Sequence, residues 1–202
     1  MKMIELHENG LDIQFRIREN GVVELADFSS QEVKKAVMEP KEDICYPAVE
    51  IHRSGTGSLN MHAYKNNINQ SSVDFVYENH ELKAQAGGKE LEIVMISPEK
   101  LKAVYHMRLF DGVPAVQTWT EIINEGSEDQ GLTYVSSFMY QGISRGGEKP
   151  YYKKTDIYVP FNSWCCEAQW QKYDVETLNL NGMVVDGFNH QGYGLNRYCY
   201  SG

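Results

Sequence analysis

Apolar and polar residues alternate along several short stretches of the chain. In Leu11–Ile17, leucine, isoleucine and phenylalanine occupy every second position, and polar side chains lie between them. A period of two places one set of side chains on each face of a β-strand. Asn-Gly pairs at 9–10 and 20–21 bound this stretch, and Asn-Gly is a preferred dipeptide of tight hairpin turns. The N-terminal part is therefore predicted to form an antiparallel meander.

Strand-like patterns recur along most of the remaining chain, with short spacing and many turn residues. The predicted strands are residues 21–28, 48–53, 73–81, 90–96, 102–110, 116–123 and 132–143. Helical spacing occurs only in residues 162–178, where Trp164, Ala168 and Tyr173 predict a short helix or turn near the C-terminus.

Residues 111–138 contain two of these strands and an acidic connection between them. Asn124, Glu125 and Gly126 end the first strand, and the polar residues 127–130 that follow offer no hydrophobic face. Because Gly126 tolerates turn geometry, a hairpin or a longer reversal is expected before the second strand begins at Leu132.

The pattern as a whole predicts an all-β protein built from two packed antiparallel sheets. No change in composition, no linker and no repeat divides the 202 residues, so a single domain over 1–202 is expected. A chain of this length can bury roughly 70% of the surface that it exposes when unfolded. It therefore needs no disulfide or structural metal to hold a core.

Charge and cysteine content exclude several classes of partner. The net charge is −9, with 28 acidic and 19 basic residues, and a negative field repels nucleic acid. Charges at Lys2, Glu5 and Glu8 interrupt the N-terminus, and no run of 18 apolar residues occurs, so neither a secretory signal nor a membrane span is expected. The four cysteines lack metal-ligand spacing. A reduced, cytoplasmic protein without metal or cofactor is predicted.

The familiar catalytic motifs are missing from the sequence, but one polar run stands out. There is no GxSxG elbow, phosphate-binding glycine loop, HExxH or dinucleotide fingerprint. Residues 52–70 carry two histidines, Arg53, Lys65 and five asparagine or glutamine residues around Tyr64. Such side chains match sugar hydroxyls, and an aromatic ring can stack on a sugar face. A solvent-exposed loop whose asparagines serve turns is the alternative.

Two further groups of residues allow a structural or a functional interpretation. Glu50 and His52 share one face of a predicted strand and could form an acid/base pair, although a structural histidine is the more common case. Trp119, Trp164 and Trp170 could pack in a core or an interface, or provide sugar platforms.

Four stretches, in order along the chain, resemble the N-terminal domain of the α-galactosidases of glycoside hydrolase family 36. They are YPAVEIH at 46–52 with the polar loop, GVPAVQTWTEIIN at 112–124 with VSSF at 135–138, NSWCCEAQW at 162–170, and GLNRYCYSG at 194–202. The resemblance implies a galactose mutarotase-like supersandwich, an antiparallel two-sheet fold. It also implies that a catalytic (β/α)8 barrel with the aspartate nucleophile and acid/base follows after Gly202.

The same resemblance implies that this chain carries no catalytic residue of the retaining hydrolysis. Its expected partners are its own barrel, further copies in a homo-oligomer, and a galactoside oligosaccharide. The family's substrate-contacting loop matches residues 60–66, so Asn60, His62 and Lys65 are the expected substrate-binding residues. His62 and Lys65 match the family pattern directly, whereas Asn60 stands where the family has an acidic residue. A related α-glycosidase specificity therefore remains open.

Two other functions remain as alternatives. The chain could be a non-catalytic carbohydrate-binding module, either stand-alone or as an interface module whose sandwich docks on a barrel and completes an oligomer. It could also be an aldose 1-epimerase-like enzyme, which needs a glutamate and a histidine that converge on a sugar ring. Glu50, His52, His106 and Glu121 are the candidates for that role.

Overall fold

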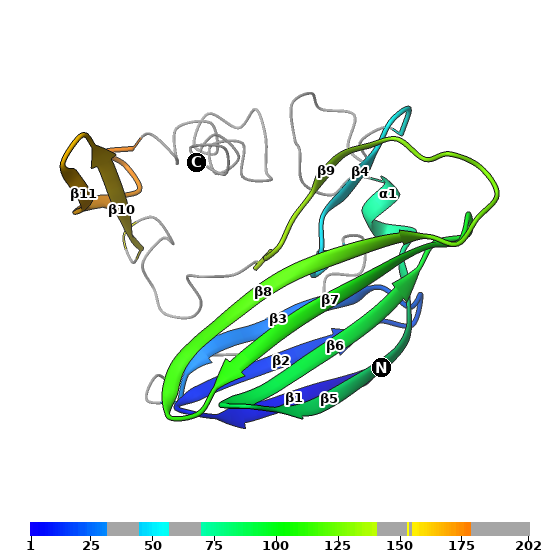
Figure 1. The fold of residues 1–202 in the computed structure, drawn as a ribbon, viewed down its shortest axis with the longest axis horizontal. Coiled ribbons are helices and arrows are strands. Elements are labelled where there is room, and N and C mark those ends of the chain that lie inside the picture. Colours follow the sequence, from blue (N-terminus) through cyan, green and yellow to red (C-terminus); the bar gives the residue numbers. More distant parts are fainter. Residues whose placement is uncertain (32–44, 57–69, 141–152, 154, 179–202) are drawn as a thin grey trace. The chain divides into compact units, whose positions relative to one another are not determined.

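The computed structural model describes residues 1–31, 45–56, 70–140, 153 and 155–178, and in these ranges the chain is almost entirely antiparallel β (Figure 1). The all-β prediction is confirmed. The chain groups into two compact units. The described part of the first unit is 1–31, 45–56 and 70–140, and that of the second is 153 and 155–178. That residues 1–202 form one domain stays a prediction.

The N-terminal sheet of the first unit is the predicted meander. It has the order β1 (Lys2–Glu8), β2 (Leu11–Ile17), β3 (Val23–Ser30), and both pairings are antiparallel. Asn9 and Gly10 have φ values of 53° and 81°, which is the left-handed geometry that the two-residue I′ hairpin turn requires. The Asn-Gly signal therefore sets the register in which Glu8 faces Leu11.

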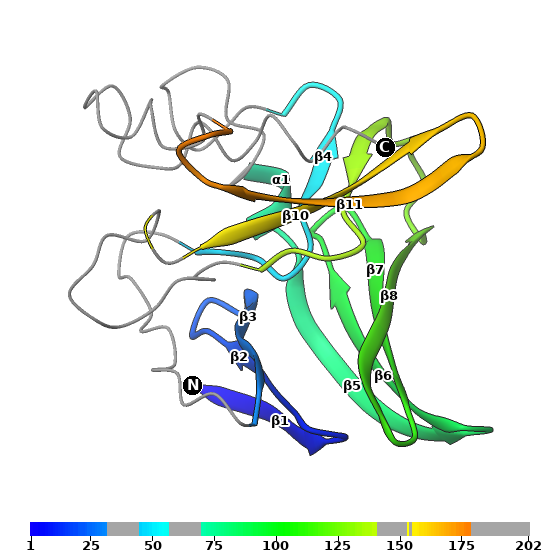
Figure 2. The same ribbon diagram turned by 90° about the vertical axis from the view of Figure 1, so that its left-hand side faces the viewer.

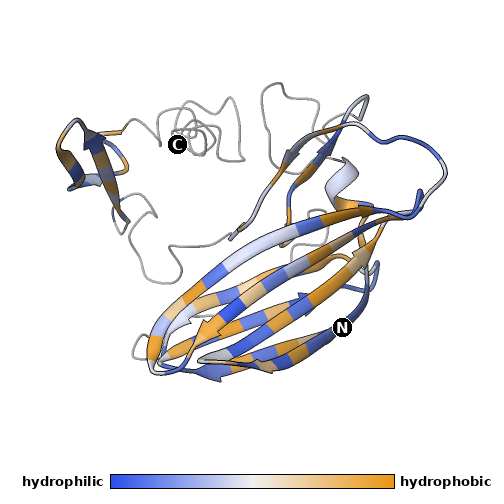
Figure 3. Ribbon diagram, in the orientation of Figure 1, coloured by the Kyte–Doolittle hydropathy of each residue, from blue (hydrophilic) through white to orange (hydrophobic). Residues whose placement is uncertain are grey.

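A second, four-stranded sheet follows the chain order without crossovers. Its strands are β5 (Val76–Gln85), β6 (Gly88–Ile96), β7 (Leu101–Phe110) and β8 (Val113–Asn124). Polar and apolar residues alternate along these strands (Figure 3). In β6, Leu91 and Ile93 are buried in the core, while Glu90 and Glu92 lie on the other face.

The two sheets face each other and share one hydrophobic core (Figure 2). Phe15 of β2 and Tyr105 of β7 meet edge to face, with ring centroids 5.7 Å apart. Desolvation in this core raises the pKa of the Tyr105 hydroxyl far above its ordinary value. The predicted packing of two sheets is confirmed.

A short strand pair and one helical turn complete the described part of the first unit. They are β4 (Ile51–Arg53), α1 (Gln70–Val73) and β9 (Leu132–Val135). β9 pairs with β4 rather than with β8, so the longer reversal is correct and a direct hairpin is wrong. Gly126 N–H donates to Asn124 Oδ1, and the Asn124 amide donates to the carbonyl of Glu128. These bonds close the turn that follows β8.

The second unit contains a hairpin where a helix was one of two predicted forms. Its strands are β10 (Asp156–Ser163) and β11 (Cys166–Asp174). The helix is wrong, whereas the alternative prediction of a turn holds at Trp164 and Cys165, which separate the strands. Cys165 has a φ of 59°, and a positive φ is incompatible with a right-handed helix. Across the described ranges, the structure contains no helix long and apolar enough to cross a membrane.

Candidate functional site

The polar loop that was predicted to contact sugar connects β4 to α1. Asn60, His62 and Lys65, and also Tyr64, lie outside the described residues. The structure does describe both ends of this loop, at Thr56 and at Gln70. Contacts at these two ends show whether they are held together.

Two serines of α1 bind the backbone of β4 and so join the two ends of the loop. Ser72 Oγ accepts from the Ile51 N–H at 2.8 Å and donates to the Ile51 carbonyl at 3.0 Å. Ser71 Oγ donates to the same carbonyl and accepts from the Arg53 N–H at 3.2 Å. Both serines and this part of β4 are buried. Hydrogen bonds in a buried site resist opening, since a broken bond would leave desolvated polar groups.

Arg53 adds an ionic anchor at the same place. Its guanidinium donates to Glu99 at 2.6 Å and to Asp74 at 3.0 Å, and it is almost fully buried. Desolvation acts to raise the pKa of Glu99, but hydrogen bonds from its own N–H, from Ser97 and from Arg53 outweigh it and hold that pKa below the ordinary value. The first residues of the loop therefore start from a fixed, charge-paired base.

Glu50 and His52 lie in contact on one face of the β4 segment, as the alternation predicted. Glu50 Oε1 and His52 Nε2 are 3.0 Å apart. Glu50 is held by reciprocal bonds with Ser136, whose Oγ accepts from the Glu50 N–H and whose N–H donates to the Glu50 carbonyl. The His52 ring lies 5.1 Å from the ring of Tyr134 on β9. A buried carboxylate beside an imidazole can exchange a proton with it.

The other acid/base candidates, His106 and Glu121, come together on the outer face of the four-stranded sheet. His106 Nε2 lies 3.9 Å from Glu121 Oε1. Trp119 stacks on the His106 ring, with centroids 4.6 Å apart and an interplanar angle of 4°. Side chains alternate between the two faces of a strand, and Thr118 and Thr120 lie on the core side of β8. Trp119, between them, therefore packs on the side of the sheet opposite the core.

The remaining two tryptophans are exposed on the hairpin of the second unit. Trp164 is 94% exposed and Trp170 is 64% exposed. Core packing is therefore wrong for both. A role in an interface or as a sugar platform stays a prediction.

Several residues that anchor the two ends of the polar loop were not singled out by the sequence. Ser71, Ser72, Asp74 and Glu99 come from α1, from the residue after it and from the turn that precedes β7. They lie 18 to 46 positions from the β4 residues that they bind, and no local periodicity indicates such contacts. The Ser-Ser pair directly after the polar loop was the one available signal.

Comparison with known proteins gives similar solved structures alone. No family model and no curated protein matches the chain. One similar structure is the GH36 α-galactosidase AgaA from Geobacillus stearothermophilus, with 12% sequence identity and a TM-score of 0.40, covering 63% of this chain and 23% of that one. Another is a doubly substituted form of AgaA in complex with raffinose, also with 12% identity and a TM-score of 0.40, covering 62% and 22%.

The chain thus spans less than a quarter of the length of these structures. They are α-galactosidases of the family that the four sequence stretches resemble.

Proposed function

We propose that the chain is a non-catalytic β-sandwich domain of an α-galactosidase, and that its polar loop at 60–66 contacts the terminal galactoside. The observation that carries the proposal is the anchored base of this loop. Ser71, Ser72 and Arg53 tie its two ends together through buried hydrogen bonds and ion pairs. A substrate-contacting loop gains affinity when its ends are fixed before the ligand arrives, because less conformational freedom is lost on binding.

The chemistry of the loop suits a sugar. His62 and Lys65 supply hydrogen-bond donors, and the amide of Asn60 supplies a donor and an acceptor. Neighbouring sugar hydroxyls need both kinds of partner. Because Asn60 is uncharged, its bond to a hydroxyl is weaker than that of a carboxylate, which permits a substrate range different from that of enzymes with an acid there.

The bond-breaking step belongs, in this proposal, to a (β/α)8 barrel. Retaining hydrolysis needs one carboxylate to attack and a second to protonate the leaving oxygen, about 5 Å apart across the glycosidic bond. The barrel would supply both as aspartates.

The sandwich then acts as a scaffold, and the exposed Trp164 and Trp170 are candidates for a contact between copies in a homo-oligomer. Cys45, Cys165 and Cys166 are free thiols, in keeping with a cytoplasmic enzyme.

A test of the non-catalytic role uses the 202-residue chain by itself. We expect it to release no nitrophenol from an aryl α-galactoside above the rate in buffer, because the attacking and protonating carboxylates reside elsewhere. The assay follows absorbance with a full-length α-galactosidase as a positive control. Release that depends on the concentration of the chain would contradict the proposal.

The contact between Glu50 and His52 favours one second candidate, an aldose 1-epimerase-like activity. This pair could remove a proton from the anomeric hydroxyl and return one to the ring oxygen. Polarimetry of freshly dissolved α-galactose distinguishes the two functions. Our proposal expects the rate of anomer exchange to be the same with and without the chain, whereas acceleration that is lost in Glu50→Gln would establish the epimerase.

A further inference from the structure

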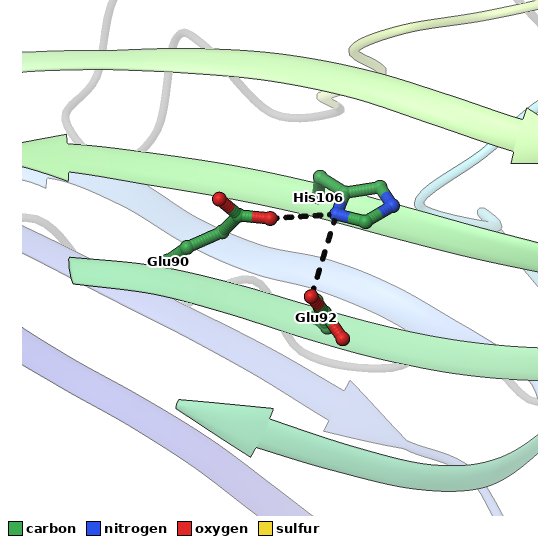
Figure 4. A group of neighbouring side chains, drawn as sticks. All are labelled: Glu90, Glu92 and His106. Atoms are coloured by element: carbon green, nitrogen blue, oxygen red, sulfur yellow. Dashed lines mark hydrogen bonds and ion pairs between the residues drawn. The ribbon is translucent and has the colours of Figure 1, made fainter. Parts of the chain in front are cut away.

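A compact group of metal-ligating side chains lies on the outer face of the four-stranded sheet. It consists of Glu90 and Glu92 of β6 and His106 of β7, here named the Glu–His cluster (Figure 4). Glu92 and His106 are directly opposite in the register of the two strands. Glu90 lies two positions away on the same face. Pleat and register alone therefore bring the three side chains together.

The donor atoms of the cluster converge on one nitrogen. His106 Nδ1 lies 2.9 Å from Glu90 Oε1 and 4.0 Å from Glu92 Oε1. The three donor atoms all lie within 4.8 Å of one another. Ligands of a tetrahedral zinc ion, at about 2.0–2.1 Å from the metal, are separated by about 3.3 Å. Small side-chain movements would bring the present atoms to that spacing.

Each carboxylate is oriented by a second contact on its far oxygen. The Gln85 amide donates to Glu90 Oε2, and Lys83 Nζ donates to Glu92 Oε2 at 2.5 Å. The Oε1 atom of each glutamate is thus left directed towards the imidazole (Figure 4).

The other nitrogen of His106 supplies an independent observation. His106 is 7% exposed, and its Nε2 is buried without a hydrogen-bond partner among the residues that the structure describes. This atom lies 3.9 Å from Glu121 Oε1, while Trp119 stacks on the ring and fixes its plane. A metal-bound histidine usually donates its second N–H to a carboxylate. Glu121 is placed to receive that bond once Nδ1 binds a cation.

We propose that the Glu–His cluster binds a divalent transition-metal ion of the zinc class through Glu90, Glu92 and His106 Nδ1. Two carboxylate oxygens and one imidazole nitrogen form a donor set that zinc accepts, and three protein ligands leave a coordination position open to water. The ion also offsets the repulsion among three neighbouring carboxylates, those of Glu90, Glu92 and Glu121. His106 lies 14 positions after Glu92 and 16 after Glu90, so no contiguous ligand motif indicates the site.

The test is calorimetric titration of the chain with Zn²⁺. Cys165 and Cys166 are exposed thiols and would also bind zinc, so both are first replaced by serine. We expect one ion per chain. Glu90→Gln and His106→Gln should each weaken binding by at least about 10-fold, and Glu121→Gln should weaken it by a smaller factor. His80→Gln is the matched control, because this histidine of β5 binds Tyr77 and takes no part in the cluster.

A second readout uses the unsubstituted ligands and so does not depend on the folding of any cluster variant. Nitrogen chemical shifts of the imidazoles are recorded with and without one equivalent of Zn²⁺. We expect a large change at His106 Nδ1 and little change at His80. Absence of saturable binding, binding that survives both ligand variants, or an unchanged His106 Nδ1 resonance would each overturn the proposal.

Discussion

Buried charged side chains of the first unit have several partners each. Glu24 is almost fully buried, lies 3.1 Å from Arg18 and 3.4 Å from Arg16, and accepts a bond from the Tyr46 N–H at 2.9 Å. Burial of a charge is tolerated only when partners replace its lost water. Glu24 therefore joins β2, β3 and the segment that leads to β4 into one network.

Replacement of Glu24 by glutamine should destabilise the protein by about 3 kcal/mol, because it leaves buried arginine charge without its carboxylate. Urea unfolding followed by circular dichroism measures the change. Asp12→Asn is the control, since the His7–Asp12 pair lies at the surface, and its midpoint should hardly move. An equal loss in both variants would contradict the role of burial.

Two histidines should titrate on opposite sides of 6.5. The hydrogen bond to Asp12 raises the pKa of His7, whereas burial, aided by the charge of Lys2, lowers that of His80. The contribution of His7 to stability is full below pH 6.5 and is lost as pH rises through its folded pKa. The contribution of His80 is lost as pH falls from 6.5 through its folded pKa. NMR titration checks the order, and Asp12→Asn should lower the pKa of His7 alone.

The strands of the first unit owe their stability chiefly to the packing of one sheet on the other. Phe15 of β2 is fully buried and contacts Tyr105 of β7. An aromatic side chain at such a position contributes more than any single turn or surface pair. Removal of this ring therefore tests whether the two sheets share a core.

Phe15→Ala should lower the free energy of unfolding by about 3–5 kcal/mol through lost burial and the remaining cavity. Ile123→Ala on β8 is the control, because Ile123 is 42% exposed and lies outside the core, and its cost should stay below about 1 kcal/mol. Chemical denaturation of both variants provides the comparison. Similar costs would mean that Phe15 does not bridge the two sheets.

Alternation was sufficient to predict β2, β6 and β7, because each buries one face against the core. It could not predict that β9 pairs with β4, since that pairing joins segments about 80 positions apart. The hairpin β10–β11 was missed because its apolar residues do not face a core and so show no clear alternation. Trp164, which lies in its turn, has a helix-like spacing to Ala168 and Tyr173.

At the scale of the whole molecule, the sequence predicts the strands better than it predicts the contacts at the candidate sites. The contact of Glu50 with His52 followed from the period of a strand. The serine and arginine anchors of the polar loop and the Glu–His cluster did not, because cross-strand register and distant chain segments create them. The proposed sugar-contacting residues come from the resemblance, and the structure adds the hydrogen bonds and ion pairs that anchor the two ends of their loop.

The central claim is that residues 60–66 contact the galactoside in the full enzyme. Steady-state kinetics on a terminal α-galactoside test it most directly, with His62→Ala and Lys65→Ala as the test variants. Ser58→Ala is the control, because Ser58 belongs to the polar run at 52–70 but lies outside residues 60–66. We predict that each of the first two raises KM or lowers kcat by about 10-fold, the value of one lost hydrogen bond to substrate. The melting temperatures of all three variants and the kinetic constants of the Ser58→Ala control should stay unchanged. Wild-type kinetics in both His62→Ala and Lys65→Ala would contradict the claim.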